Sequence, residues 1–316
     1  MAEYRLRAAW GRGWILKILI TGSSGLIGSA LTSFLIANGH EIYPIVRARG
    51  RVAARAIPWN PSAGILPLEA LEGADAAIHL AGESIAGGRW TAERKRRILE
   101  SRRDGTRLLA GSLGRLSAPP KVLISASAIG YYGDRGEEVL KETSAPGRGF
   151  LADVCREWEN AARPAAERGI RLVTLRTGLV LSSTGGVLSR ILVPYRWGLG
   201  GKIGSGRQYM SWIALDDLVK AIYHAIQNEE IIGPMNAVAP YPVANLEFTK
   251  TLGRVLSRPT LFPLPATAAR LLLGEMADAL LLASVRVEPA SLLDSGFRFE
   301  FSDLDSALRH LLELGK

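Results

Sequence analysis

Three evenly spaced glycines, Gly22, Gly25 and Gly28, lie between the apolar run 18–20 and an amphipathic stretch at 26–38. Where a buried strand leads into a helix, such glycines permit a tight turn and a close approach of the backbone to a pyrophosphate. The free amides and the dipole of the helix N-terminus then favour the phosphate charge. The segment therefore predicts a dinucleotide site, and the contacts expected within it are Gly22, Ser24, Gly25, Leu26, Ile27 and Gly28.

The choice of dinucleotide depends on the end of the second expected strand. NAD-selective sites carry an acidic residue there, about twenty residues beyond the glycine loop, which binds the ribose hydroxyls. This chain has Arg47 at that point, with Arg49 and Arg51 close behind. A guanidinium can grip a ribose 2′-phosphate through two hydrogen bonds, so the sequence favours NADP(H) over NAD. A solvated basic loop is the alternative interpretation.

A third apolar run at 75–82 ends in small residues, which allow the backbone to pass beside the adenosine and ribose of a bound dinucleotide. His79 lies within this run. We expect it to be a packed core histidine rather than a catalyst.

Up to residue 180 the chain alternates apolar runs with longer amphipathic segments, as in strand-helix-strand units of a parallel sheet. The expected strands are 17–20, 41–47, 76–80, 122–125 and 172–176, and the expected helices are 26–38, 91–113 and 151–168. We predict an α/β fold with a Rossmann-type doubly wound parallel sheet over residues 16–180.

Beyond residue 180 glycine-rich loops at 185–186 and 198–201 precede further helical segments at 215–227, 245–256, 266–283 and 302–314. Residues 181–316 are expected to form a smaller, substrate-side mixed α/β subdomain with C-terminal helices. Some later strands and helices can return to the first domain. Residues 1–15 lack the apolar core of a secretory signal, and we expect a dispensable or mis-started extension, with Leu16 as the initiator. A transit peptide is the alternative.

The composition is that of an ordinary globular protein with an excess of positive charge. The net charge is +9 and the pI is about 9.9. The basic residues gather at 47–55 and 89–107, within the nucleotide-binding half, which fits phosphate binding or a solvated helix face. Nucleic-acid binding through the 89–107 helix is a third candidate function. We expect a small-molecule substrate, no nucleic acid and no membrane partner.

Cys155 is the single cysteine, so an intramolecular disulfide and a cysteine-based zinc cluster are both excluded. We expect a cytoplasmic protein that holds no metal and is a monomer or homodimer. The longest apolar stretch, 264–285, is interrupted by charges at Arg270, Glu275 and Asp278, and this predicts a helix of a soluble domain rather than a membrane span.

Several further motifs accompany the glycine loop. They are Ala81-Gly82-Glu83, Arg89-Trp90-Thr91, Ser101-Arg102, Ser127-Ala128-Ile129-Gly130-Tyr131-Tyr132-Gly133-Asp134, Trp158-Glu159, Leu175-Arg176-Thr177-Gly178, Gly198-Leu199-Gly200-Gly201, Gly204-Ser205-Gly206, Trp212-Ile213 and Asn236-Ala237-Val238-Ala239-Pro240. With these residues, 16–315 resembles the atypical "epimerase family" branch of the extended short-chain dehydrogenase/reductases, which has a small C-terminal domain. The resemblance implies further cofactor contacts from Leu80, Ala81, Gly82, Arg102 and Val180.

The resemblance departs from the usual pattern at the catalytic pair. Typical members hold the substrate oxygen with Ser or Thr and use a Tyr-x-x-x-Lys pair, in which lysine lowers the tyrosine pKa. Ser127 matches the first role. Phe150 and Val154 fall at the tyrosine and lysine positions, and neither side chain can transfer a proton.

Three interpretations follow. Tyr131 or Tyr132 supplies the proton of an atypical reductase or epimerase acting on a small carbonyl or sugar-type substrate. Alternatively, Ser127 alone orients and polarises a carbonyl. In the third, the chain is a non-catalytic NADP(H)-binding sensor or regulatory module. For the substrate side we expect Gly204, Gln208 and Trp212, on and beside a glycine-rich loop.

Overall fold

A seven-stranded sheet forms the centre of the protein in the computed structural model, which describes residues 15–47 and 55–313. Its spatial order is β11-β7-β5-β4-β1-β2-β3, and each neighbouring pair is parallel. The strands are β1 (Lys17–Thr21), β2 (Glu41–Arg47), β3 (Ile57–Trp59), β4 (Ala76–His79), β5 (Val122–Ala128), β7 (Arg171–Thr177) and β11 (Gly233–Ala237). The predicted doubly wound fold is confirmed.

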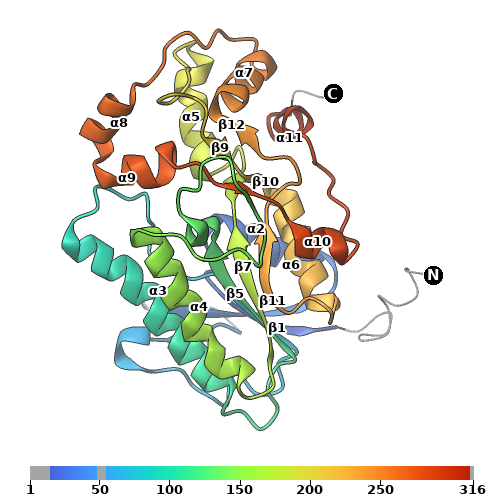
Figure 1. Cartoon of the computed structure of the whole chain (residues 1–316). Coiled ribbons are helices and arrows are strands. Elements are labelled where there is room, and N and C mark those ends of the chain that lie inside the picture. The colour runs from blue at the N-terminus through green and yellow to red at the C-terminus, as the bar shows by residue number, and fades with distance from the viewer. Residues whose placement is uncertain (1–14, 48–54, 314–316) are drawn as a thin grey trace.

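Helices cover both faces of this sheet (Figure 1). Ile18 and Ile20 of β1 pack in one core with α2 (Leu26–Ala37) and α6 (Leu215–Gln227). Leu19, between them, points to the opposite face and packs in a second core with α3 (Ala92–Leu113) and α4 (Phe150–Ala166). Because both faces are buried, the central strands are continuous apolar runs rather than alternating ones.

The strand order reverses between β1 and β4, since β2 and β3 lie beyond β1 while β5, β7 and β11 lie beyond β4. Ligands of open α/β sheets bind at such a switch point, outside the carboxyl ends of the strands. The glycine loop leaves β1 at this edge, and residues 80–82 leave β4 beside it.

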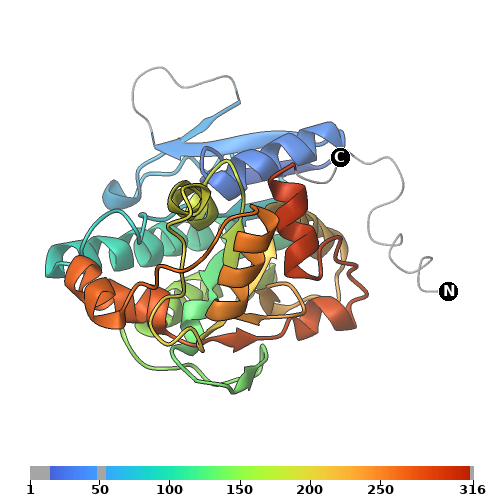
Figure 2. The same cartoon turned by 90° about the horizontal axis from the view of Figure 1, so that it is seen from above.

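The later part of the chain builds a second layer at one end of the sheet. Its elements are β8 (Leu179–Leu181), α5 (Gly186–Arg196), β9 (Tyr209–Met210), β10 (Trp212–Ala214), β12 (Val243–Ala244), α7 (Asn245–Val255), α8 (Ala266–Leu273), α9 (Glu275–Ala277), β13 (Arg286–Val287), α10 (Ala290–Asp294) and α11 (Leu304–Leu311). In Figure 1 α5, α7, α8 and α11 lie together at this end, and Figure 2 looks onto it.

Two-stranded sheets tie this layer together: β8 with β10, β9 with β12, and β13 with β6 (Val139–Leu140). A third core, which includes Trp212 and Phe248, fills it. The later elements α6 and β11 lie with the central sheet instead, and α10 packs against β11, with Leu292 in the core that includes α2 and α6. How the chain divides into domains stays a prediction, as does the role of residues 1–15, of which 1–14 fall outside the described residues.

One local expectation was wrong, and several elements were not predicted. The single helix expected at 266–283 is broken at Gly274, which has φ +61°, into α8, α9 and a π-helical turn, Asp278–Leu282. The sequence interpretation also missed α5, whose interior contains Pro194, and β3, which is three residues long and contains Pro58. Proline normally argues against helix interiors and strands, so tertiary packing outweighed local preference at both places. No helix among the described residues is long and apolar enough to cross a membrane.

Candidate cofactor and active site

The glycine loop is so tightly wound that side chains are excluded from two of its positions. A Cβ on Gly28 would lie 2.1 Å from the Gly22 carbonyl oxygen, and one on Gly22 would lie 2.9 Å from the Ala81 nitrogen. Gly22 also has φ +72°, a backbone conformation that favours glycine. No side chain caps α2, whose N-cap is Gly25, so the first-turn amides are available to an anion. These residues fit a dinucleotide pyrophosphate.

A buried hydrogen-bond relay fixes the neighbouring strand ends. The Thr21 hydroxyl oxygen accepts hydrogen bonds from the Leu80 and Ala81 amides, at 3.1 and 3.2 Å. Its proton is therefore donated to His79 Nδ1, 2.7 Å away. Burial lowers the pKa of His79 to about 4, so the imidazole is neutral and carries its proton on Nε2. His79 is fully buried, as expected of a core histidine, and it holds the strand ends around Gly22 in place.

Arg102 is the second basic residue expected at the cofactor. Its Nη1 donates to the Glu83 carbonyl at 2.9 Å, and its guanidinium lies 4.8 Å from the Trp158 ring. A Cβ on Gly82 would lie 3.3 Å from its Cζ, so Arg102 packs directly across the end of β4. Burial lowers its pKa from the usual arginine value. The side chain thus lies next to Gly82, and its contact with a cofactor stays a prediction.

Arg47 and Val180 approach the same edge from other elements. Arg47 is the last residue of β2 and is exposed, whereas Arg49 and Arg51 fall outside the described residues. Val180 lies in β8 and packs against the core that includes α2. A Cβ on Gly185, just beyond β8, would lie 3.0 Å from the Leu26 side chain of the glycine loop.

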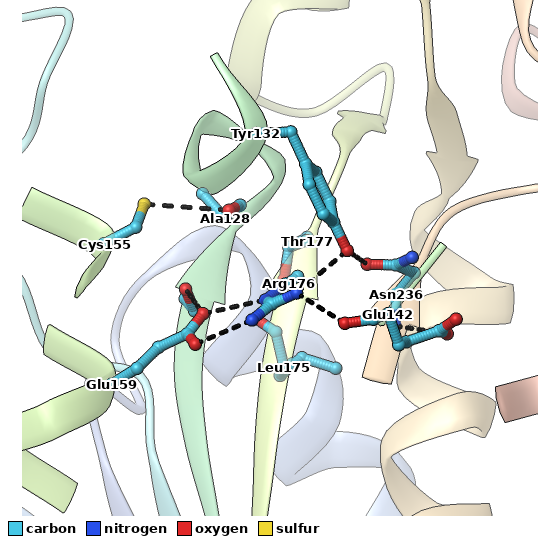
Figure 3. Close-up of polar contacts among 10 residues, drawn as sticks. Ala128, Tyr132, Glu142, Cys155, Glu159, Leu175, Arg176, Thr177 and Asn236 are labelled. Atoms are coloured by element: carbon cyan, nitrogen blue, oxygen red, sulfur yellow. Dashed lines mark hydrogen bonds and ion pairs between the residues drawn. The ribbon is translucent and has the colours of Figure 1, made fainter. Parts of the chain in front are cut away.

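A charged network centred on Arg176 and Glu159 (Figure 3) reaches Ser127, the next-to-last residue of β5. Ser127 donates its hydroxyl proton to Glu159 Oε1 at 2.8 Å. Arg176 binds the same carboxylate with Nε and Nη2, each at 2.9 Å, and its Nη1 donates to the Glu142 carbonyl at 3.1 Å. Arg176 is 2% exposed, and the carboxylate holds the pKa of the guanidinium above its usual range against the effect of burial.

The two adjacent tyrosines occupy different surroundings. Tyr132 has no exposed surface; its hydroxyl donates to Asn236 Oδ1 at 2.7 Å and accepts from Arg176 at 3.0 Å. Burial raises its pKa. Tyr131 is half-buried, and its ring centroid lies 3.5 Å from the guanidinium carbon of Arg176. The geometry therefore gives Tyr132 a structural position and leaves Tyr131 the better placed to meet a ligand.

The two positions in α4 that correspond to the usual catalytic pair offer no group for proton transfer. Phe150 packs edge-on against Trp90, with ring centroids 5.0 Å apart, and Val154 is buried. Cys155 is also buried, with its thiol 3.6 Å from the Ala128 carbonyl, and burial raises its pKa to about 11. The Lys95 ammonium lies 5.1 Å from the Phe150 ring and is ion-paired.

The residues expected on the substrate side lie in the interior of the second layer. Trp212 has no exposed surface, and its indole nitrogen donates to the Tyr241 carbonyl at 3.2 Å. Gln208 is 6% exposed, and its amide donates to two backbone carbonyls. A Cβ on Gly204 would meet the Leu282 side chain at 2.8 Å. The polar groups of Gln208 and Trp212 are thus hydrogen-bonded to backbone carbonyls of this layer. This corrects the expectation that these two side chains face a substrate.

Comparison with known proteins adds the family to this geometry. Residues 18–238 match the NAD dependent epimerase/dehydratase family, and residues 264–311 match a domain of unknown function, DUF1731. The chain belongs to the NAD dependent epimerase/dehydratase family. The resemblance found in the sequence is thereby confirmed.

Relatives within the family cover nearly the whole chain. An epimerase family protein of Mycobacterium bovis is 44% identical over 291 residues, which are 92% of this chain and 96% of that protein. The crystal structure of human epimerase family protein SDR39U1 (isoform 2) with NADPH is 34% identical, with a TM-score of 0.87 over 94% of this chain and 99% of that one. The structure of a nucleoside-diphosphate sugar epimerase from Corynebacterium glutamicum is 39% identical, with a TM-score of 0.79 over 95% of this chain and 59% of that one.

The sequence alone did not predict the polar network around Arg176 and Glu159. Thr21, Asn236 and Glu142 were assigned no role, and Glu159 and Arg176 appeared only within motifs. Glu159 lies 32 residues from Ser127 in the chain, so no local spacing connects them. The available signal was Arg176, a charged residue at the end of the apolar run 172–175.

Proposed function

We propose that this chain binds NADP(H) on the Gly22–Gly28 loop and acts as an oxidoreductase or epimerase on a small carbonyl or sugar-type substrate. The observation that carries the proposal is the backbone cradle at the switch point, in which a Cβ on Gly28 would come within 2.1 Å of the Gly22 oxygen. When bound, the nicotinamide supplies or accepts a hydride. Cofactor choice, substrate binding and proton exchange are assigned to side chains of this chain.

Preference for NADP(H) rests on Arg47. Its side chain is exposed at the end of β2, where the ribose of a dinucleotide on the glycine loop is bound in this fold. A guanidinium there pairs with a 2′-phosphate and gains nothing from an unphosphorylated ribose. The human relative solved with NADPH supports the same choice.

On the substrate side, we assign Ser127 the role of hydrogen-bond acceptor. Its proton is already donated to Glu159, so a substrate carbonyl would have to compete for that proton. A substrate hydroxyl can donate to the Ser127 oxygen and leave the bond to Glu159 intact. The arrangement therefore favours a hydroxyl-bearing substrate, and Glu159 acts as the positioning residue that holds the Ser127 hydroxyl.

In this proposal the usual Tyr-x-x-x-Lys pair is lacking, because Phe150 and Val154 occupy its positions. Proton exchange then falls to Tyr131, whose hydroxyl makes no hydrogen bond to the described part of the chain and whose ring is held against Arg176. The second layer, from residue 181 onward apart from α6 and β11, would close over the substrate. A single cysteine fits a reducing compartment, and a cytoplasmic location is part of the proposal.

A second candidate function is an NADP(H)-binding sensor without turnover. The observation that favours it lies at α4, where Phe150 packs against Trp90 and the nearby Lys95 is committed to Glu275. The Phe150 ring has no exchangeable proton and the Lys95 ammonium is held in an ion pair, so neither Phe150 nor Lys95 serves in proton transfer in this arrangement.

The test compares binding with turnover. NADPH and NADH are titrated into the protein and into Arg47→Asp by fluorescence, and both proteins are screened for NADPH oxidation and NADP reduction with carbonyl, alcohol and sugar-nucleotide libraries. Loss of a charge-assisted contact predicts NADPH binding about 10- to 100-fold weaker, with NADH little changed. Equal loss for both cofactors would refute the role of Arg47, and tight NADPH binding without turnover on any library would favour the sensor.

A further inference from the structure

Five large apolar side chains are exposed together on the second layer. Val193 of α5 is 60% exposed, and Trp197 and Leu199 just beyond this helix are 79% and 56% exposed. Leu261 and Phe262, from the connection between α7 and α8, are 77% and 59% exposed. These residues, called here the apolar surface, play no part in the proposed function.

The two segments that form the apolar surface lie side by side. The Phe262 amide donates to the Gly200 carbonyl at 3.1 Å, and the Leu264 amide donates to the Lys202 carbonyl at 2.9 Å. Val193 lies in the last turn of α5, and Trp197, its C-cap, follows four residues later. Figure 1 shows α5 and the connection between α7 and α8 at the same end of the molecule. The exposed side chains are thus presented by a hydrogen-bonded framework.

The two segments that form the apolar surface carry positive charge and no negative charge. Neither 168–215 nor 248–274 contains an aspartate or glutamate. Arg190, Arg196 and Arg258 are exposed and have no ion-pair partner among the residues that the structure describes. Arg258 Nε donates to the Arg196 carbonyl at 2.9 Å, which joins the basic residues of the two segments.

The combination of exposed apolar side chains with arginines distinguishes between the possible partners of this surface. A second copy of the chain in a symmetric contact would bring the same arginines face to face without carboxylates to pair them. A nucleic acid would engage the arginines and leave the indole and the leucines in water. An anionic lipid surface satisfies both features, because Trp, Phe and Leu enter the boundary between headgroups and acyl chains while arginines meet the lipid phosphates.

We propose that the apolar surface, with Arg190, Arg196 and Arg258, docks this protein onto an anionic membrane surface. The contact is peripheral, since no described helix is long and apolar enough to cross a bilayer. This inference revises the expectation from the sequence that the chain has no membrane partner. That expectation was based on charge and hydrophobicity along the chain, which do not show that two distant segments lie side by side.

The test is co-sedimentation of the full chain with vesicles of neutral phosphatidylcholine and with vesicles in which about a third of the lipid is anionic phosphatidylglycerol. The protein is expected to bind the anionic vesicles much more strongly and to dissociate as salt is raised. Trp197→Ser/Leu261→Ser should weaken binding about tenfold, because two apolar side chains no longer enter the bilayer. Arg190→Gln/Arg196→Gln should weaken it about 25-fold, at roughly fivefold per charge.

Matched controls lie elsewhere on the surface. Ile36→Ser/Ile232→Ser removes two apolar side chains that are 57% and 67% exposed, and Arg115→Gln removes an exposed arginine. The control variants should bind as the wild type does. Thermal unfolding of every variant shows whether the fold is intact, so that lost binding is not mistaken for lost structure.

A direct readout of depth uses lipids brominated on their acyl chains. The apolar surface predicts quenching of tryptophan emission that Trp197→Phe abolishes while vesicle binding is retained. Equal binding to neutral and anionic vesicles, or equal losses in the control variants, would overturn the proposal. So would light scattering that shows a dimer split by Trp197→Ser/Leu261→Ser together with no vesicle binding, because the apolar surface would then be an interface between copies.

Discussion

Arg176 grips the carboxylate of Glu159 through two parallel hydrogen bonds, Nε to Oε1 and Nη2 to Oε2, each 2.9 Å long. The side chains are 3% and 15% exposed, so the pair lies largely out of water. Removing one partner of such a pair leaves an uncompensated charge in the interior. The pair also links β7 to α4 (Figure 3), and the same Glu159 carboxylate accepts the Ser127 hydroxyl proton.

Arg176→Met should therefore lower the free energy of unfolding by about 3 to 5 kcal/mol. Arg176→Met/Glu159→Leu, which removes both charges, should recover a substantial part of that loss. Urea denaturation of both variants at neutral pH measures the difference. If the double variant is no more stable than Arg176→Met, the cost arises from lost packing rather than from the stranded Glu159 carboxylate.

Gly28→Ala tests the cradle of the glycine loop. Its new Cβ would lie 2.1 Å from the Gly22 oxygen, so the turn must open, and we expect NADPH binding to fall by at least tenfold. Gly111→Ala is the matched control, because a Cβ at Gly111, within α3, meets nothing within 4 Å. That substitution should leave NADPH binding unchanged and stabilise the protein by up to about 1 kcal/mol. Calorimetric titration of both variants decides; unimpaired binding by Gly28→Ala would contradict the proposed site.

The two tyrosines give opposite expectations in the same assay. Tyr131→Phe should abolish turnover of whichever substrate the library screen yields, while NADPH affinity and stability stay near those of the wild type. Tyr132→Phe strips a buried partner from Asn236 and Arg176, so it should cost about 1 to 3 kcal/mol of stability. Steady-state kinetics and urea denaturation measure the two effects. Full activity in Tyr131→Phe would remove this residue from the mechanism.

The longer strands and helices up to residue 180 could be predicted from the sequence because each carries its own signal, whereas the short strands β3 and β6 could not. Buried parallel strands are short continuous apolar runs such as 17–20, and the glycine loop has a spacing that few other structures require. Cofactor residues on that loop could therefore be named individually. The second layer has weaker signals, since strands such as β9 and β12 contain two residues each.

The polar centre could not be predicted in the same way. The partners of Ser127 are Glu159, 32 residues away, and through it Arg176, and sequence spacing carries no information on contacts across α4, β5 and β7. Trp212 and Gln208 illustrate the reverse error. Their types and glycine-rich surroundings fit a binding loop. In the structure, however, the Trp212 ring packs in the third core and the Gln208 amide donates to backbone carbonyls.

The buried His79 makes stability depend on pH. Its pKa is about 4 in the folded protein, against about 6.5 when exposed in the unfolded chain. Between these values the unfolded state binds the extra proton, so the free energy of unfolding should fall as pH is lowered from about 6.5 to 4. The difference of about 2.5 pKa units corresponds to about 3 kcal/mol. Burial also lowers the pKa of His40 and His224, which adds to the same trend.

His79→Asn isolates this contribution, because an amide oxygen can still accept the Thr21 proton but cannot titrate. At neutral pH the variant loses some packing against Trp59, whose ring centroid is 6.0 Å from that of His79, and it should be less stable than the wild type. Between pH 6.5 and 4, however, its free energy of unfolding should decline less steeply, by about 3 kcal/mol over the window. Urea denaturation at several pH values measures both slopes. Equal slopes would show that His79 is as readily protonated in the folded protein as in the unfolded chain, and the relay from His79 through Thr21 to the cofactor loop would then need a different proton arrangement.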